Sequence, residues 1–147
     1  MELYRKRKTG KSYQTQNLVN ERIRRGLDRW LDEEGYADPD MSVADVALYV
    51  GVSTEQLEFF FRTEMHVQFR SFRKQLRIER AQLLLIESPE LPVSVIGKMV
   101  GINDRSVFRR QFHEITGLYP TEWRERRNDR KLKSLLAKVK VVVFKRI

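Results

Sequence analysis

The feature that most constrains the fold of this chain is an approximate internal repeat. The segment VADVALYVGVSTEQLEFFF, residues 43–61, is echoed by VSVIGKMVGINDRSVFRRQF, residues 93–112. The offset is 50 residues between Gly51 and Gly101, and it is one residue longer from Leu57 onward. One extra residue therefore lies in the second turn or at the start of the next helix. A repeat at a nearly fixed offset indicates two copies of one supersecondary unit.

Each copy has the sequence pattern of a helix-turn-helix. Gly51 and Gly101 stand where the turn is expected to need a positive φ angle, and Ala47 and Gly97 are small residues where the second helix must cross closely. The wedge between the helices is predicted to be filled by Val46, Val50, Val52 and Leu57, and by Ile96, Val100, Ile102 and Phe108. The predicted N-caps are Ser42, Ser53 (with Gln56 as a capping box), and Asn103 or Asp104.

Between the copies, residues 68–87 are predicted to form one uninterrupted helix, which ends at Ser88 and Pro89. A helix of about 20 residues spans about 30 Å, close to the ~34 Å turn of B-DNA. Recognition helices at its two ends would be spaced for successive major grooves on one face of DNA.

The chain before the first copy is predicted to hold an arm and one further helix. Residues 1–14 contain many basic and few apolar side chains, so we expect a mobile basic arm. From about Thr15 to Glu34, apolar residues recur at helical spacing, and the helix is predicted to end near Gly35. The apolar residues of this face are Leu18, Ile23, Leu27, Trp30 and Leu31.

Charge is distributed unevenly along the chain, whose 147 residues carry a formal net charge of +9. Residues 28–64 hold ten acidic and two basic side chains, whereas residues 104–147 hold thirteen basic and five acidic ones. Most of the capacity to neutralise phosphate therefore lies in the C-terminal third. Because the chain has no cysteine and no apolar run of about 20 residues, we expect a cytoplasmic protein.

Catalysis is not expected from this sequence. His66 and His113 are the only histidines, there is no glycine-rich phosphate loop, and no cluster has metal-ligand spacing. His66 is interpreted as a helix-end residue rather than as a base. No cofactor and no metal are predicted.

The segment GINDRSVFRRQFHEITGLYPTEWR, residues 101–124, resembles the signature of the AraC/XylS family of bacterial transcription regulators. The matching positions are Gly101, Asp104, Ser106, Phe108, Arg110, Phe112, Gly117, Pro120, Trp123 and Arg124. The resemblance covers about residues 42–127. It implies an all-α fold of about seven helices, with two helix-turn-helix subdomains joined by a long linker helix, which binds duplex DNA near promoters and usually activates transcription.

The resulting organisation has three parts. An arm at 1–14 is followed by a DNA-binding domain at 15–127 and a basic tail at 128–147. Within the domain, the first helix and first helix-turn-helix span 15–67, the linker helix 68–87, and the second helix-turn-helix 88–127. The tail is expected to pack on the first helix, to mediate association, or to be disordered.

The resemblance also implies partners. Duplex DNA is the expected ligand, and RNA polymerase is a further partner that the resemblance allows. The family usually attaches this domain to a sensory or effector-binding part, and none is visible here. The chain is therefore expected to be either a small stand-alone regulator or the C-terminal piece of a larger one. Residues 5–8, RKRK, are interpreted either as the juxtamembrane segment of a membrane-anchored regulator or as part of a solvated, phosphate-seeking arm.

The second recognition helix is predicted to supply most of the DNA contacts. Burial of Phe108, Phe112 and Ile115 leaves a polar outer face. The residues predicted to contact DNA on that face are Arg105, Ser106, Arg109, Arg110 and His113. Arginine can donate two parallel hydrogen bonds to guanine in the major groove. Arg110 has an alternative interpretation as a residue that braces the fold.

The first recognition helix is acidic where DNA-facing residues are usually polar or basic. Its predicted DNA-binding residues are Glu55, Phe59 and Arg62, with Glu58 beside them. Because these carboxylates would face the DNA polyanion, this unit is predicted to bind DNA weakly or to face a protein. A protein-interaction module with degraded DNA reading is therefore the rival function, and RNA binding is a weaker one.

Three further basic residues are predicted as weaker phosphate contacts: Arg73, Lys74 and Arg124. The alternative for the linker helix is a solvated basic face on which Arg77 forms an internal ion pair.

Overall fold

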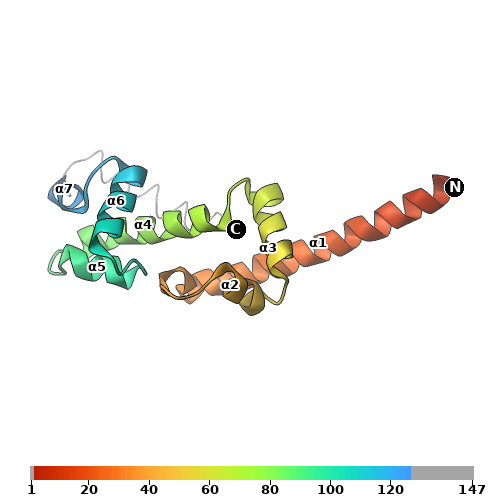
Figure 1. Cartoon of the computed structure of the whole chain (residues 1–147), viewed down its shortest axis with the longest axis horizontal. Coiled ribbons are helices and arrows are strands. Elements are labelled where there is room, and N and C mark those ends of the chain that lie inside the picture. Colours follow the sequence, from red (N-terminus) through yellow and green to blue (C-terminus); the bar gives the residue numbers. More distant parts are fainter. Residues whose placement is uncertain (1, 127–147) are drawn as a thin grey trace. The chain divides into compact units, whose positions relative to one another are not determined.

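The computed structural model describes residues 2–126, with side chains described from residue 12 onward. The described residues form helices and no strands (Figure 1), which confirms the predicted all-α class. The α-helices are α1 (Glu2–Asp32), α2 (Val43–Val50), α3 (Thr54–Phe60), α4 (Phe69–Glu87), α5 (Val93–Met99), α6 (Arg105–Thr116) and α7 (Pro120–Glu125). A 3-10 helix, η1 (Gly35–Ala37), follows α1, and a π-helical turn, η2 (Phe61–Met65), follows α3. The predicted tail at 128–147 lies outside the described residues.

The described helices divide into two compact units. Unit 1 contains residues up to Glu33 together with Ser42–Phe69, and unit 2 contains Glu34–Met41 together with the residues from Arg70 onward. The first helix-turn-helix, α2 and α3, therefore belongs to unit 1. The second, α5 and α6, belongs to unit 2, with most of α4. The linker helix has nearly the predicted bounds.

Unit 1 packs α2 and α3 against the C-terminal half of α1, while the N-terminal half of α1 extends past them (Figure 1). Its buried core consists of Ile23, Leu27, Trp30, Val46, Ala47, Val50, Leu57, Phe60, Phe61 and Phe69. The rings of Trp30 and Phe61 both contact Phe69, with centroids 5.8 and 5.3 Å from its own. The start of α4 therefore closes the core of the first unit.

The first helix differs from the predicted one at three points. It begins at Glu2 rather than near Thr15, through the segment predicted as an arm, because extending a nucleated helix costs little. Leu18 was predicted to be buried and is 68% exposed. The buried face of α1 includes Ile23 and, three residues before it, Asn20. Leu18 does not lie on this face. After the helix, Glu34 takes the positive φ angle, +53°, that glycine would favour.

The local signals of both helix-turn-helix copies are confirmed. Gly51 and Gly101 have φ angles of +86° and +91°. Capping boxes begin α2 at Ser42 and α3 at Ser53. Asp104 caps α6, since its carboxylate accepts a hydrogen bond of 2.8 Å from the Val107 N–H. These contacts satisfy N–H groups that have no partner within their own helix.

Unit 2 gathers α5, α6 and α7 around the C-terminal half of α4 (Figure 1). Its core consists of Ile78, Ala81, Leu84, Leu85, Ile96, Val100, Ile102, Phe108, Phe112 and Trp123. Gly97 permits the close crossing of α5 and α6, because a Cβ atom there would lie 2.9 Å from Cδ1 of Phe108. The packing of α6 on this core decides which of its side chains face outward.

Candidate nucleic-acid interface

The outer face of α6 presents every residue that was predicted for it. Phe108 and Phe112 are buried, and Ile115 is half-buried, so the helix has one apolar side. The exposed residues on the other side include Arg105, Ser106, Arg109, Arg110 and His113. The structure therefore brings five predicted residues onto one face of one helix, without itself testing what they bind.

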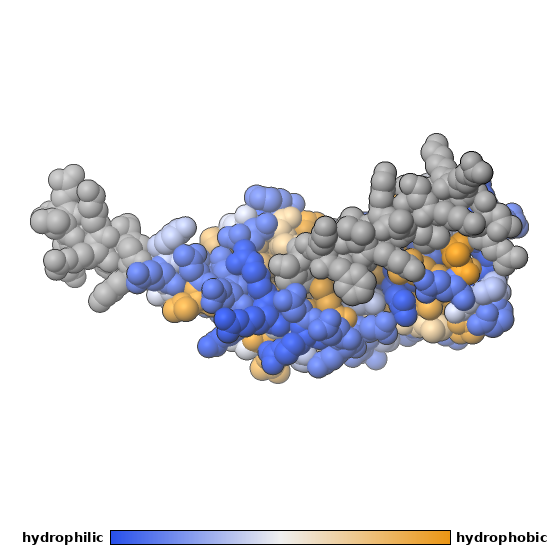
Figure 2. Space-filling view, turned by 180° about the vertical axis from the view of Figure 1, so that it is seen from behind, coloured by the Kyte–Doolittle hydropathy of each residue, from blue (hydrophilic) through white to orange (hydrophobic). Residues whose placement is uncertain are grey.

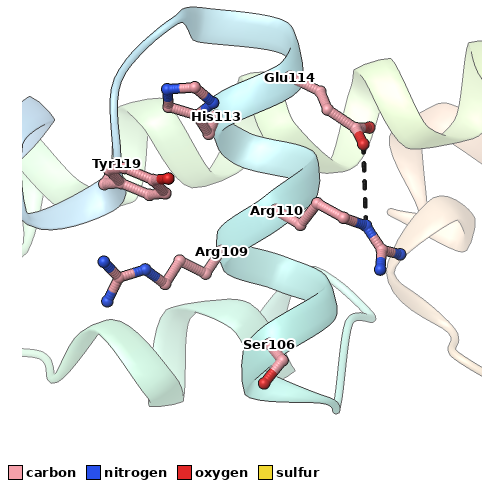
Figure 3. Close-up of a pocket in the computed structure, with 6 residues that line it drawn as sticks. All are labelled: Ser106, Arg109, Arg110, His113, Glu114 and Tyr119. Carbon is pink, nitrogen blue, oxygen red and sulfur yellow. Dashed lines mark ion pairs between the residues drawn. The ribbon is translucent and has the colours of Figure 1, made fainter.

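Three of these side chains are held by neighbours (Figure 3). The guanidinium carbon of Arg109 lies 4.5 Å from the centroid of the Tyr119 ring, and the His113 imidazole stacks on that ring with centroids 4.4 Å apart. Nε of Arg110 lies 3.7 Å from Oε1 of Glu114. Arg110 is exposed, so this ion pair is a weak brace. With Ser106, these residues line a shallow, open pocket.

Tyr119 is the residue of this surface that sequence reasoning missed. It is half-buried and lies after the end of α6, in the turn that leads to α7. Helical periodicity assigns faces only within a helix, so it carries no signal for a residue beyond the turn. The only sequence signal for a role of Tyr119 was an aromatic side chain directly before Pro120.

The two recognition helices differ in charge. In α6 there are three arginines and one glutamate, whereas α3 and η2 together hold three glutamates and one arginine. The exposed residues of the first unit include Glu55, Glu58, Phe59 and Arg62, as predicted. The Arg62 guanidinium lies over the Phe59 ring at 5.5 Å. An acidic surface of this kind is unfavourable beside a polyanion.

The π-helical turn at the end of this helix was not predicted. Glu64, within it, accepts hydrogen bonds of 3.1 Å from both Asn20 and Arg24 of α1. His66 follows with a φ angle of +55° and ends the turn, which confirms its interpretation as a helix-end residue. The contacts from α1 depend on tertiary packing and could not be read from local sequence.

Two of the weaker phosphate candidates have internal contacts. Arg124 is half-buried, and its Nε donates to the Leu85 carbonyl at 3.1 Å and its Nη2 to the Ser88 carbonyl at 3.4 Å. Arg73 is half-buried and donates to the Met41 carbonyl. Burial, and secondarily the nearby Arg70, lowers the pKa of Arg73. These contacts support a bracing role for both residues. An arginine has five N–H donors, so the predicted phosphate contacts stay predictions.

The other basic residues of α4 are also engaged. Nζ of Lys74 lies 3.7 Å from Oε2 of Glu114. On the interpretation of a solvated basic face, Arg77 was expected in an internal ion pair; it donates to the main-chain carbonyls of Tyr36 and Asp38. Burial lowers its pKa to about 10. Arg77 therefore fastens η1 to α4.

The part of the chain that the structure describes lacks two other classes of site. No group of three or more His, Asp or Glu side chains there is placed to hold a metal ion. None of the helices described is both long enough and apolar enough to cross a bilayer.

On the face shown in Figure 2, hydrophilic residues cover most of the described surface and hydrophobic ones appear in separate patches.

A family model described as a helix-turn-helix domain matches residues 46–126, more than half of the chain. Over 88 residues the chain is 35% identical to the arabinose operon regulatory protein of Escherichia coli K12. The chain belongs to the AraC/XylS family. This is a family of DNA-binding transcription regulators rather than of enzymes.

Solved structures agree with this assignment. The C-terminal domain of AraT, a response regulator from Geobacillus stearothermophilus, aligns with a TM-score of 0.63 at 26% identity, over 71% of this chain and 84% of that one. An AraC-type transcriptional regulator from Chromobacterium violaceum aligns with a TM-score of 0.57 at 29% identity, over 60% and 79%. In the E. coli arabinose regulator, the match covers 60% of this chain but 30% of the relative. The AraC/XylS similarity therefore concerns the DNA-binding domain.

Proposed function

We propose that this AraC/XylS-family chain binds duplex DNA sequence-specifically, activates transcription, and reads the major groove mainly through α6. The observation that carries the proposal is the exposed face of α6, on which Arg105, Arg109 and Arg110 are followed by His113. Guanidinium groups on a helix of this kind can pair with guanine edges, and Ser106 near the helix N-terminus suits a phosphate. We also propose that RNA polymerase is a partner, that a sensory part acts with this domain, and that the protein is cytoplasmic.

A second function is favoured by one observation. The exposed face of α3 and η2 carries Glu55 and Glu58, which would approach DNA phosphates unfavourably. The first unit would then face a protein, and in the extreme case the whole chain would be an interaction module of the same fold that has lost DNA reading.

Selection of bound sites from a library of random duplexes, using the full chain, separates the two functions. We expect one sequence to be enriched and to bind about 10³-fold or more tightly than a scrambled duplex. We also expect the affinity to fall steeply with salt, because bound arginines displace condensed counterions. Absence of enrichment, with equal affinity for selected and scrambled duplexes, would overturn the proposal and favour the interaction module.

A further inference from the structure

We propose that Tyr119 is a positioning residue of the DNA-reading surface, which holds Arg109 and His113 in the orientation in which they meet a base pair. This inference rests on the proposed function. It assigns a role to a residue outside α6, and it predicts that recognition of one base pair depends on a ring that need not touch that base pair.

The sequence around the end of α6 explains why the ring lies where it does. Gly117 ends the helix with a φ angle of +77° and turns the chain back. The turn is fixed by Thr116, whose hydroxyl donates to the Phe112 carbonyl at 2.8 Å and accepts from the Leu118 N–H at 3.1 Å. The next residue, Tyr119, therefore returns alongside α6 instead of continuing away from it.

The far side of the turn is equally constrained. Tyr119 is the N-cap of α7, and its carbonyl accepts a hydrogen bond of 2.9 Å from the Trp123 N–H. Trp123 is buried, and its indole N–H donates to the Gln82 carbonyl of α4 at 3.2 Å. The backbone that carries the tyrosine ring is thus anchored to the core of unit 2 on both sides.

The ring separates two side chains that stand one helical turn apart on α6. Figure 3 shows the His113 imidazole and the Arg109 side chain on opposite sides of Tyr119. The imidazole stacks at an interplanar angle of 21°, and the guanidinium carbon lies 4.5 Å from the ring centroid. Arginine over an aromatic face is attracted by the ring quadrupole. Both side chains are therefore restrained before DNA arrives.

This restraint distinguishes Arg109 from the other arginines of the helix. Among contacts between described residues, Arg110 is held by the carboxylate of Glu114, and no ring contact restrains Arg105. A long side chain that is already ordered loses less conformational entropy when it binds. Removing the ring should therefore weaken recognition by Arg109 and leave general attraction to phosphates unchanged.

The test compares Tyr119→Leu, Tyr119→Phe and Arg109→Ala in the full chain, with the selected duplex and a scrambled one as probes. We expect Tyr119→Leu to weaken binding to the selected duplex about two- to tenfold while leaving the scrambled duplex and the salt dependence unchanged. Tyr119→Phe, which keeps the ring, should bind like wild type. In the Arg109→Ala background, Tyr119→Leu should have a smaller effect, namely the part that acts through His113.

Three outcomes would overturn the inference: equal losses on both duplexes, no rescue by Tyr119→Phe, or full additivity with Arg109→Ala. A second measurement needs no variant. In the wild-type protein, ¹⁵N relaxation of the arginine Nε groups should show Arg109 more ordered than Arg105, and equal mobility would also overturn it. If wild type fails to discriminate the duplexes, the proposed function fails, while the relaxation measurement still decides whether the ring holds Arg109.

Discussion

Two glycines of unit 2 have positive φ angles but different surroundings. A Cβ atom on Gly101 would lie 2.7 Å from the carbonyl oxygen of Ala37, whereas one on Gly117 would meet no atom within 4 Å. Gly117→Ala should therefore cost only the left-handed conformation, about 1–2 kcal/mol. Gly101→Ala should lower the free energy of unfolding by more, since backbone must also move. Urea denaturation of both variants measures the difference, and equal costs would contradict the close contact.

The carboxylate of Asp45 gives stability that depends on pH. It accepts hydrogen bonds of 2.8 Å from the backbone N–H and the hydroxyl of Ser42, and these bonds hold its pKa below the ordinary value of 3.8. A folded pKa below the unfolded one stabilises the fold above about pH 4, and this contribution is lost as pH falls through the folded pKa. Asp45→Asn should therefore lower Tm near pH 7 and have little effect near pH 2.

Thermal unfolding of Asp45→Asn at several pH values checks this expectation, with Asp28→Asn as the control for loss of an exposed carboxylate. A decrease in Tm that is the same at all pH values would show that the capping box does not depend on the charge of Asp45.

At the scale of elements, α7 is fastened to the end of α4 by Arg124. Its guanidinium donates to the carbonyl of Leu85, in the last turn of α4, and to that of Ser88, which also accepts from the Leu91 N–H. Arg124→Met should lower the free energy of unfolding by about 1–3 kcal/mol. The matched control, Arg126→Met, removes an exposed arginine of the same helix end and should stay within about 0.5 kcal/mol of wild type.

The same pair of variants decides between bracing and phosphate contact. Once the stability of each variant is known from denaturant titration, the salt dependence of DNA binding is measured. Bracing predicts an unchanged slope for Arg124→Met. A slope reduced by about one unit, with stability unaffected, would instead identify Arg124 as a phosphate contact.

The elements that could be predicted from sequence are those decided by local chemistry. The caps at Ser42, Ser53 and Asp104 and the turns at Gly51 and Gly101 follow from rules that act within a few residues. What could not be predicted depends on partners distant in sequence. Examples are the close approach of Gly26, whose Cβ would lie 2.8 Å from Cγ1 of Val50, and the π-helical turn η2.

The candidate site divides in the same way. Helical periodicity placed the five α6 residues on one exposed face, because burial of Phe108 and Phe112 determines the opposite side. Periodicity could not show that Arg73 and Arg124 would turn inward to main-chain carbonyls, or that Tyr119 would return beside α6. Those placements depend on where the chain goes after each helix ends.

At the scale of the whole molecule, we expect DNA reading to be divided unequally between the two copies of one motif. Each unit contains one copy of the repeat and the same helix-turn-helix fold. The two recognition helices, α3 and α6, nevertheless carry opposite net charge. Because carboxylates are repelled by phosphates and arginines pair with bases, the second unit should supply most of the affinity and specificity.

Footprinting and affinity measurements on the selected duplex, with two double variants, test this unequal division. Arg105→Ala with Arg109→Ala should abolish specific binding, since each bidentate pair with guanine contributes about 1–3 kcal/mol of discrimination. Glu55→Gln with Glu58→Gln should tighten binding or leave it unchanged. A footprint lost equally in both double variants would show that the two units contribute equally.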